Sequence, residues 1–133
     1  MKIVLDANIF ISAFFWGGKP QQVMERVISG IDELYITKEI MDEIEDVIRR
    51  PKFQANKDMV NYFLTSIEEI GNKITPQKLQ SNGSRDRKDN IYIECGIAAN
   101  ADYIISGDIH LLEMGKYGKI RISSARDYLS ILA

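Results

Sequence analysis

The sequence is poor in the residues that cross-link secreted proteins or bind soft metals. Cys95 is the only cysteine and His110 the only histidine among 133 residues. A lone cysteine can form neither an internal disulfide nor a cysteine-based zinc cluster, and we expect Cys95 to be a small buried apolar residue. The chain also lacks a run of about 20 apolar residues, the length needed to cross a bilayer. These absences exclude a disulfide-stabilised fold, a zinc finger and a transmembrane protein.

A signal peptide and an excess of basic charge are also missing. The chain begins Met-Lys and enters "IVLDAN" without a long apolar segment or a cleavage site, which predicts a cytoplasmic protein. Its net charge of −2 is not that of a general nucleic-acid binder. Any binding of nucleic acid would have to be local. A divalent cation held by clustered acids would reconcile an acidic protein with a polyanionic ligand.

The pattern of apolar residues predicts strands alternating with helices over 1–133, which we interpret as a single domain. Strands are expected over 2–6, 34–37, 72–75, 102–106 and 119–122. Helices are expected over 21–29, 38–50, 58–70, 89–101 and 125–132, with a chain break at Gly17, Gly18 and Pro20 and a loop over 75–89. This alternation predicts a three-layer α/β/α sandwich around a mainly parallel sheet.

Two hydrophobic runs each deliver an aspartate to their far end. Asp6 follows the first predicted strand, and Asp108 follows the strand over 102–106. Ligands bind beyond the carboxyl ends of the strands in open parallel sheets, so we expect both acids at one site. Asp6 could instead cap a helix that begins at "ANIF", and Asp108 could be a turn residue. The matched placement favours function, because a cap requires no counterpart on another strand.

A third acid, Glu43, flanks the apolar stripe of the helix over 38–50. It lies three residues after Ile40 and four before Val47. The acids of this helix that fall on the opposite, solvated face are Asp42, Glu45 and Asp46. Glu43 is therefore aimed best at the sheet edge, although a border glutamate that simply extends to water is the alternative.

The segment "SRDRKDN" adds acidic and basic residues before a predicted buried helix. Asp86 and Asp89 lie in it, and Asp89 could cap the helix, coordinate a cation, or do both. Arg85, Arg87 and Lys88 form the densest local basic cluster and could contact a phosphate chain. A solvated loop of mixed charge is the alternative.

Carboxylates that converge without histidine or cysteine form a hard oxygen site. Such a site suits Mg²⁺ or Mn²⁺ and not zinc. His110 lies two residues after Asp108, and we expect it to be a surface or packing residue.

The sequence resembles the PIN-domain ribonucleases. The resemblance rests on "VLDANIFISAFFWGGKP", "EIMDEIEDVIRRPKF", "DRKDNIYIECGIAANADYIISGDIHLL" and their order along the chain. They are most similar to the bacterial and archaeal branch related to VapC, the toxin components of toxin-antitoxin pairs. The resemblance implies a PIN α/β/α fold and divalent-metal-dependent cleavage of RNA that leaves 5′-phosphate and 3′-hydroxyl ends.

The resemblance also implies roles for particular residues. It places the metal-binding and catalytic acids at Asp6, Glu43, Asp89 and Asp108. Further polar positions of the family fall on Asn8, Ser106 and Asp86, and two departures are Arg87, where proline is usual, and Gly96, where alanine is usual. Neither departure touches an implied metal ligand, so the implied site is intact. Asn8, Ser106 and the basic cluster are the expected substrate-binding residues.

Two other functions compete with the metal-dependent endoribonuclease. Phosphohydrolases with an aspartate nucleophile share only Asp6, and their pattern requires a second acid where Asn8 stands. A PIN fold that binds RNA or protein without catalysis remains the stronger alternative.

For partners, we expect RNA, a cognate antitoxin if the chain is a toxin, and self-association as a dimer. Phe14, Phe15 and Trp16 could supply an interface, although core packing is expected for at least two of them.

Overall fold

The strands of the protein form a six-stranded sheet of order β3-β2-β1-β4-β6-β5. The structure is a computed structural model that describes residues 1–79 and 82–132. The strands are β1 (Lys2–Leu5), β2 (Glu33–Ile36), β3 (Gly71–Lys73), β4 (Tyr103–Ile105), β5 (Lys116–Tyr117) and β6 (Ile120–Ser123). Neighbouring strands are parallel except β5, which is antiparallel to β6. The predicted mainly parallel sheet is confirmed.

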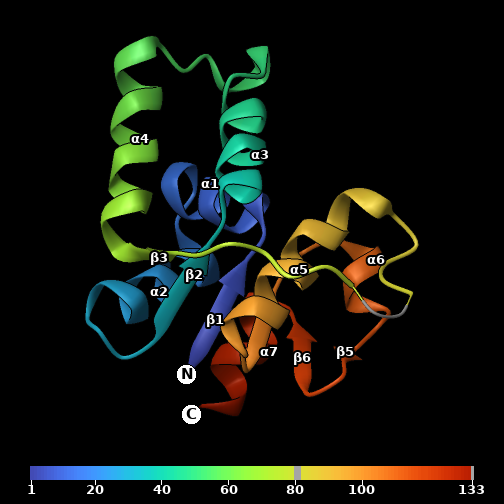
Figure 1. Ribbon diagram of the computed structural model, residues 1–133. Helices are drawn as coiled ribbons and strands as arrows, with labels where there is room; N and C mark the ends of the chain where they lie inside the picture. Colours follow the sequence, from blue (N-terminus) through green and yellow to red (C-terminus); the bar gives the residue numbers. More distant parts are fainter. Residues whose placement is uncertain (80–81, 133) are drawn as a thin grey trace.

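Helices cover both faces of this sheet and complete a three-layer α/β/α sandwich (Figure 1). They are α1 (Ala7–Phe15), α2 (Gly18–Ile28), α3 (Lys38–Ile48), α4 (Lys57–Ile70), α5 (Asn90–Ala99), α6 (Ile109–Leu112) and α7 (Ala125–Ile131), with 3-10 turns η1 (Pro51–Phe53) and η2 (Arg87–Asp89). Helix α5 packs on β1, β2 and β4, while α2 packs on α1 and α7 at the opposite face. Figure 1 shows α3 and α4 side by side, extending beyond the sheet. None of the helices in the described ranges is long and apolar enough to cross a membrane.

The two central strands explain how distant parts of the chain reach one edge. Ile3, Val4 and Leu5 of β1 are fully buried, as are Ile104 and Ile105 of β4, because helices cover both faces. Val4 pairs with Ile104 and Leu5 with Ile105. The residues that follow, at positions 6 and 106, therefore leave the sheet next to each other.

Several local expectations differ from the structure. Helix α2 begins at Gly18, three residues earlier than predicted, because Pro20 lies in its first turn, where its missing N–H is not needed. Gly17, the residue before α2, has a positive φ of 75°, a backbone conformation that glycine adopts readily. The helix α1, considered only as an alternative, is present, and the short elements β5 and α6 were not predicted. The loop expected over 75–89 includes residues 80 and 81, which lie outside the described residues.

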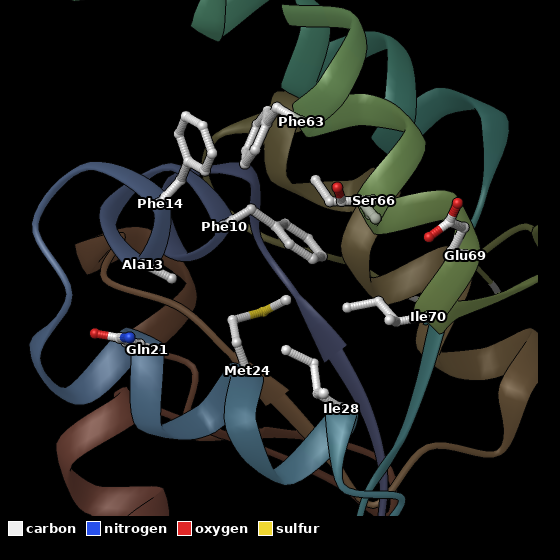
Figure 2. Close-up of a pocket in the computed structure, with 11 residues that line it drawn as sticks. Phe10, Ala13, Phe14, Gln21, Met24, Ile28, Phe63, Ser66, Glu69 and Ile70 are labelled. Atoms are coloured by element: carbon white, nitrogen blue, oxygen red, sulfur yellow. The ribbon is translucent and has the colours of Figure 1, made fainter. Parts of the chain in front are cut away.

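An apolar groove of about 360 Å³ lies between α1, α2 and α4 (Figure 2). Its lining residues are Phe10, Ala13, Phe14, Gln21, Met24, Ile28, Phe63, Ser66, Ile67, Glu69 and Ile70. Phe14, 40% exposed, packs against Phe63 with ring centroids 4.7 Å apart. Phe15 is half-buried against the core, and Phe63, the partner of Phe14, is itself a core residue, while Trp16 is 70% exposed. Phe14 and Phe15 therefore both contact the core, although Phe14 also lines the groove.

Candidate metal centre

Asp6 and Asp108 lie at the carboxyl ends of neighbouring strands and are joined through one serine. The buried Asp6 caps α1, since its Oδ1 accepts hydrogen bonds from the backbone N of Asn8 at 2.7 Å and of Ile9 at 3.3 Å. The buried Ser106 hydroxyl donates to Asp6 Oδ2, and Ser106 Oγ in turn accepts a hydrogen bond from the backbone N of Asp108 at 2.9 Å. Asp6 therefore caps α1 and also lies beside Asp108 at the same edge of the sheet.

Burial makes the charge of Asp6 costly. It raises the pKa of this carboxyl above its ordinary value, although hydrogen bonds from Ser106, Asn8, Ile9 and Gly107 act in the opposite direction. A cation placed beside Asp6 would stabilise its ionised form.

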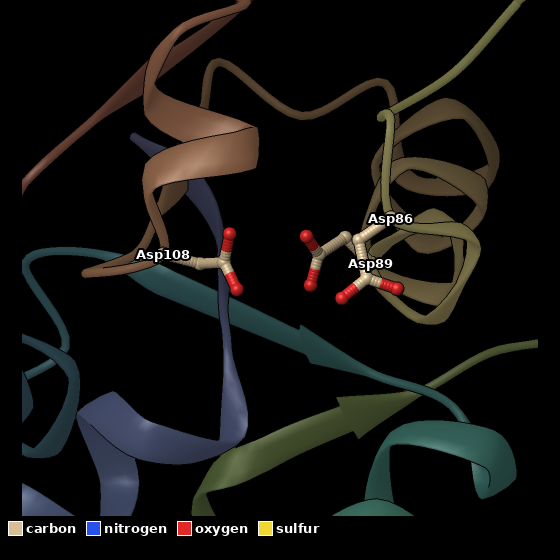
Figure 3. A group of neighbouring side chains, drawn as sticks. All are labelled: Asp86, Asp89 and Asp108. Carbon is tan, nitrogen blue, oxygen red and sulfur yellow. The ribbon is translucent and has the colours of Figure 1, made fainter.

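Three carboxylates converge beside this edge of the sheet (Figure 3). Asp86, Asp89 and Asp108 each offer an oxygen, and these oxygens all lie within 4.8 Å of one another. Asp108 comes from the segment between β4 and α6, whereas Asp86 and Asp89 come from η2 and the residue before it. Asp89 is buried and the other two are half-buried. We call this group the acid cluster; Asp6 and Glu43 are not among its members.

Ser84 positions the acid cluster from the side of η2. Its buried hydroxyl donates to Asp89 Oδ2 at 3.3 Å and accepts from the backbone N of Asp86 at 3.2 Å. The Ser84 backbone N donates to the Asn90 side chain at 2.9 Å, which fixes the serine itself. Asp89 makes no capping hydrogen bond to α5, so its carboxylate is directed to the cluster instead. Ser84 could not be singled out from the sequence, because serines are common in polar loops.

The electrostatics of the acid cluster favour a bound cation. Burial, together with the neighbouring charges of Asp108 and Asp86, raises the pKa of Asp89 to about 7. These side chains offer only oxygen atoms as ligands, and oxygen is the ligand that Mg²⁺ and Mn²⁺ prefer. The residues present therefore fit a hard divalent cation, whose charge would offset the repulsion among the three carboxylates.

Glu43 lies on α3, which packs against α1 and α5. It is half-buried and makes no hydrogen bond or ion pair with the described residues. The buried Tyr92 hydroxyl accepts from the backbone N of Ala7 at 3.1 Å, and besides burial the charges of Asp6, Glu43 and Asp89 raise the pKa of this phenol. These acids therefore surround Tyr92. Sequence reasoning missed this tyrosine, because an aromatic residue in a buried helix is typical of a core.

The remaining acids of α3 face solvent, as the helical spacing predicted. Three of them form ion pairs one turn apart near the surface, which are Lys38–Asp42 at 2.9 Å, Arg49–Glu45 at 2.9 Å and Arg50–Asp46 at 3.6 Å. Asp42 is thus a suitable control for the acids of the site.

The predicted substrate-binding residues lie around the acid cluster. Asn8 is exposed next to Asp6, and Arg85, Arg87 and Lys88 are exposed on the segment that carries Asp86 and Asp89. Arg85 lies 3.5 Å from the Glu113 carboxylate. His110 is half-buried, and its buried Nδ1 lies 3.9 Å from the Glu113 carboxylate with no hydrogen-bond partner among the described residues.

The fold and the acidic edge define a class of α/β/α proteins with a candidate cation site, and comparison with known proteins gives the family. A model described as the PIN domain matches residues 2–110, and the chain belongs to this family. A similar fold occurs in the crystal structure of VapBC2 from Rickettsia felis bound to a DNA fragment from their promoter, with a TM-score of 0.57 and 14% identity over 93% of this chain and 98% of that chain. Curated proteins gave no match. The implied family and fold are confirmed, and the roles of Asp6, Glu43, Asp89 and Asp108 stay a prediction.

We expect the metal-free protein to lose stability as the pH rises from about 4 to about 7. Asp89 has a pKa of about 7 in the folded protein against 3.8 ordinarily, so the folded state binds an extra proton in this window. The free energy of unfolding therefore falls as that proton is lost, and the full penalty is present above the folded pKa. Urea denaturation across this range would measure the slope, and saturating Mn²⁺ should abolish it.

The variant Asp108→Asn provides the control for this pH dependence. The substitution removes a charge that raises the Asp89 pKa. In the wild type, Asp108 Oδ1 accepts a hydrogen bond from the His110 backbone N at 2.7 Å, and the side-chain oxygen of asparagine can still accept it. The slope should flatten, and the melting temperature of the metal-free protein should stay or rise slightly. A large drop in melting temperature would show that Asp108 is chiefly a structural cap.

Proposed function

We propose that this PIN-domain protein is a divalent-metal-dependent endoribonuclease that hydrolyses phosphodiester bonds in single-stranded RNA with Mg²⁺ or Mn²⁺. The observation that carries the proposal is the convergence of Asp86, Asp89 and Asp108 beside Asp6 at the carboxyl edge of a PIN sheet. A carboxylate-only site with repelling charges is suited to divalent cations and poorly suited to nucleophilic or zinc chemistry.

In the proposed reaction, four acids hold the cation and one serine positions an acid. A bound divalent cation would activate water and neutralise charge on the scissile phosphate. Asp6, Glu43, Asp89 and Asp108 are the proposed cation ligands and catalytic residues. The hydroxyl of Ser106 holds the Asp6 carboxylate in place.

The proposed RNA contacts lie on the exposed residues around these acids. Arg85, Arg87 and Lys88 would contact phosphates of the bound strand, which positions it without reading its sequence. Asn8 could donate a hydrogen bond to the strand beside Asp6, and a net charge of −2 makes such local contacts necessary.

The products of the reaction test this proposal. Purified protein incubated with a labelled single-stranded RNA and Mn²⁺ should yield fragments with 5′-phosphate and 3′-hydroxyl ends, as in-line attack by water requires. A non-catalytic RNA-binding module would retain the RNA intact. Fragments with 2′,3′-cyclic phosphate ends would indicate attack by the RNA's own hydroxyl and would contradict water activation at the acids.

We further propose that the chain is the toxin of a toxin-antitoxin pair and that the groove between α1, α2 and α4 binds an apolar segment of the antitoxin. Met24, Ile28 and Ile70 converge in this groove, and Ser66 and Glu69 lie at its polar margin (Figure 2). The similar fold in VapBC2, a complex bound to promoter DNA, supports a companion protein. The groove lies on helices away from the acid cluster, so partner binding and cleavage can be separated by mutation.

Ile28→Asp should prevent antitoxin binding and leave RNA cleavage unchanged. Ile28 is 66% exposed and lines the groove, so a charge there costs little in the free protein and opposes an apolar partner. The test is co-expression with any small protein whose gene adjoins the one for this chain, followed by size-exclusion chromatography. Ile131→Asp, at a residue of α7 that is 56% exposed and outside the groove, is the matched control.

Loss of the complex in both variants, or in neither, would contradict the groove assignment. A wild-type dimer that Ile28→Asp converts to a monomer would instead identify a second copy of the chain as the occupant.

A further inference from the structure

Tyr92 carries a hydroxyl proton without an acceptor in the described part of the chain. The side chain is 4% exposed, and its oxygen accepts a hydrogen bond from the backbone N of Ala7 at 3.1 Å. The Tyr92 oxygen only accepts in that hydrogen bond, so its own O–H can still donate one. No oxygen of the described residues accepts a hydrogen bond from this O–H. Burial and the surrounding acids raise the pKa of Tyr92, so the hydroxyl keeps its proton at neutral pH. A buried donor of this kind needs an acceptor.

The position of Tyr92 directs this donor to the candidate metal centre. Tyr92 lies three residues after Asp89, on the same side of α5. Its hydrogen bond to Ala7 places the hydroxyl beside the residue that follows Asp6. Helix α3, which carries Glu43, packs against both α1 and α5. The hydroxyl is therefore enclosed by the elements that supply Asp6, Glu43 and Asp89.

Of these three acids, Glu43 alone lacks a hydrogen-bond donor in the described structure. Asp6 accepts from Asn8, Ile9 and Ser106. Asp89 accepts from the Ser84 hydroxyl at 3.3 Å. Glu43 makes no hydrogen bond or ion pair with the described residues, although its charge is close enough to affect Tyr92. The Tyr92 hydroxyl thus lacks an acceptor and the Glu43 carboxylate lacks a donor among the described residues, and α3, which carries Glu43, packs on the helices that hold Ala7 and Tyr92.

We propose that Tyr92 is the positioning residue for Glu43, whose carboxylate accepts the Tyr92 O–H when it turns inward to bind a cation. This inference rests on the proposed function, because it assumes that Glu43 is a cation ligand. A hydrogen-bonded carboxylate is fixed in one orientation, and partners behind metal ligands affect affinity for this reason. Tyr92 would act through Glu43 and would not itself touch the RNA.

A double-mutant cycle on Mn²⁺ binding tests the pairing of the two residues. The proteins are the wild type, Tyr92→Phe, Glu43→Gln and the double variant, each titrated with Mn²⁺ by calorimetry in the absence of RNA. Tyr92→Phe keeps the ring that fills the core, and it should weaken Mn²⁺ binding about 10–100-fold in the wild-type background. In the Glu43→Gln background it should change the affinity less than about twofold, because the carboxylate that it positions is gone.

Tyr128→Phe separates positioning from general destabilisation. Tyr128 is also fully buried, and its hydroxyl donates to Asp32 at 2.8 Å, away from the acid cluster. Both Tyr→Phe variants should lower the melting temperature, since each leaves a polar group without its partner. Only Tyr92→Phe should weaken Mn²⁺ binding.

The remaining outcomes overturn the inference in distinguishable ways. Equal losses from Tyr92→Phe in both backgrounds, or no loss in either, would show that Tyr92 does not act through Glu43. Unchanged binding in Glu43→Gln would remove Glu43 from the site while leaving the nuclease proposal in place. A wild-type protein that fails to bind Mn²⁺ and fails to cut RNA would refute the proposed function itself.

Discussion

Asp89→Asn is expected to bind single-stranded RNA normally and to cut it at least about 10²–10³-fold more slowly than the wild type, because a charge that acts in the transition state is lost. Asp89 is the buried member of the acid cluster, and an amide there neither holds a cation as tightly nor compensates its charge. The exposed Arg85, Arg87 and Lys88 remain to contact the RNA chain. Single-turnover cleavage rates and filter-binding affinities, measured on the same preparations, would show this separation of binding from catalysis.

Asp42→Asn is the matched control for this variant. It makes the same chemical change on the solvated face of α3, where the Asp42 side chain is 63% exposed and pairs with Lys38. Its cleavage rate should equal that of the wild type. If Asp42→Asn and Asp89→Asn were equally active, a contaminating nuclease would explain the activity better, and the assignment of the site would fail.

Asp32→Ala is expected to cause the largest loss of stability, about 2–4 kcal/mol in the free energy of unfolding, because it leaves buried partners unpaired. The Asp32 carboxylate, directly before β2, is fully buried and accepts from Arg26 Nε at 2.9 Å, the Tyr128 hydroxyl at 2.8 Å and the Met1 ammonium at 3.2 Å. Urea denaturation would measure the loss. Glu45→Ala, which breaks the exposed pair with Arg49, should cost less than about 1 kcal/mol.

The same network gives the sign of a pH effect. Burial by itself raises the pKa of Asp32, but hydrogen bonds from Arg26, Tyr128 and the chain terminus together hold it below its ordinary value of 3.8. The stabilisation is therefore present at neutral pH and is lost as the pH falls below about 4. Asp32→Ala should be less sensitive than the wild type to acid in this range. An Asp32→Ala protein as stable as Glu45→Ala would show that the network contributes nothing measurable.

The central part of the fold could be predicted because its signals are local and strong. Strands β1 and β4 are continuous aliphatic runs, and α3 and α4 repeat apolar residues at helical spacing. Strand β5 has two residues and α6 four, which is too short for any periodicity to show. The start of α2 was misplaced because Pro20 was interpreted as a break, although proline is tolerated in a first helical turn.

The acids of the candidate site could be predicted where they end a strand, flank an apolar stripe or precede a buried helix. Asp6 and Asp108 follow directly from the parallel register of β1 and β4. Ser84 and Tyr92 acquire their positions through contacts with residues that are distant in sequence or in other elements, and their residue types carry no comparable signal. The sequence position of Asp86 does not reveal its role, because only the folded chain brings its carboxylate within 4.8 Å of Asp108.

The cation dependence of RNA cleavage tests the central claim most directly. The rate at which wild-type protein cuts a labelled single-stranded RNA would be measured after removal of divalent ions by a chelator, and again after titration with Mn²⁺ or Mg²⁺. The proposed site predicts no cleavage in the chelator and full recovery on titration, with Asp42→Asn following the same curve and Asp89→Asn remaining inactive. Cleavage that continues in excess chelator, or that Asp89→Asn supports as well as the wild type, would contradict a cation-dependent reaction at the acid cluster.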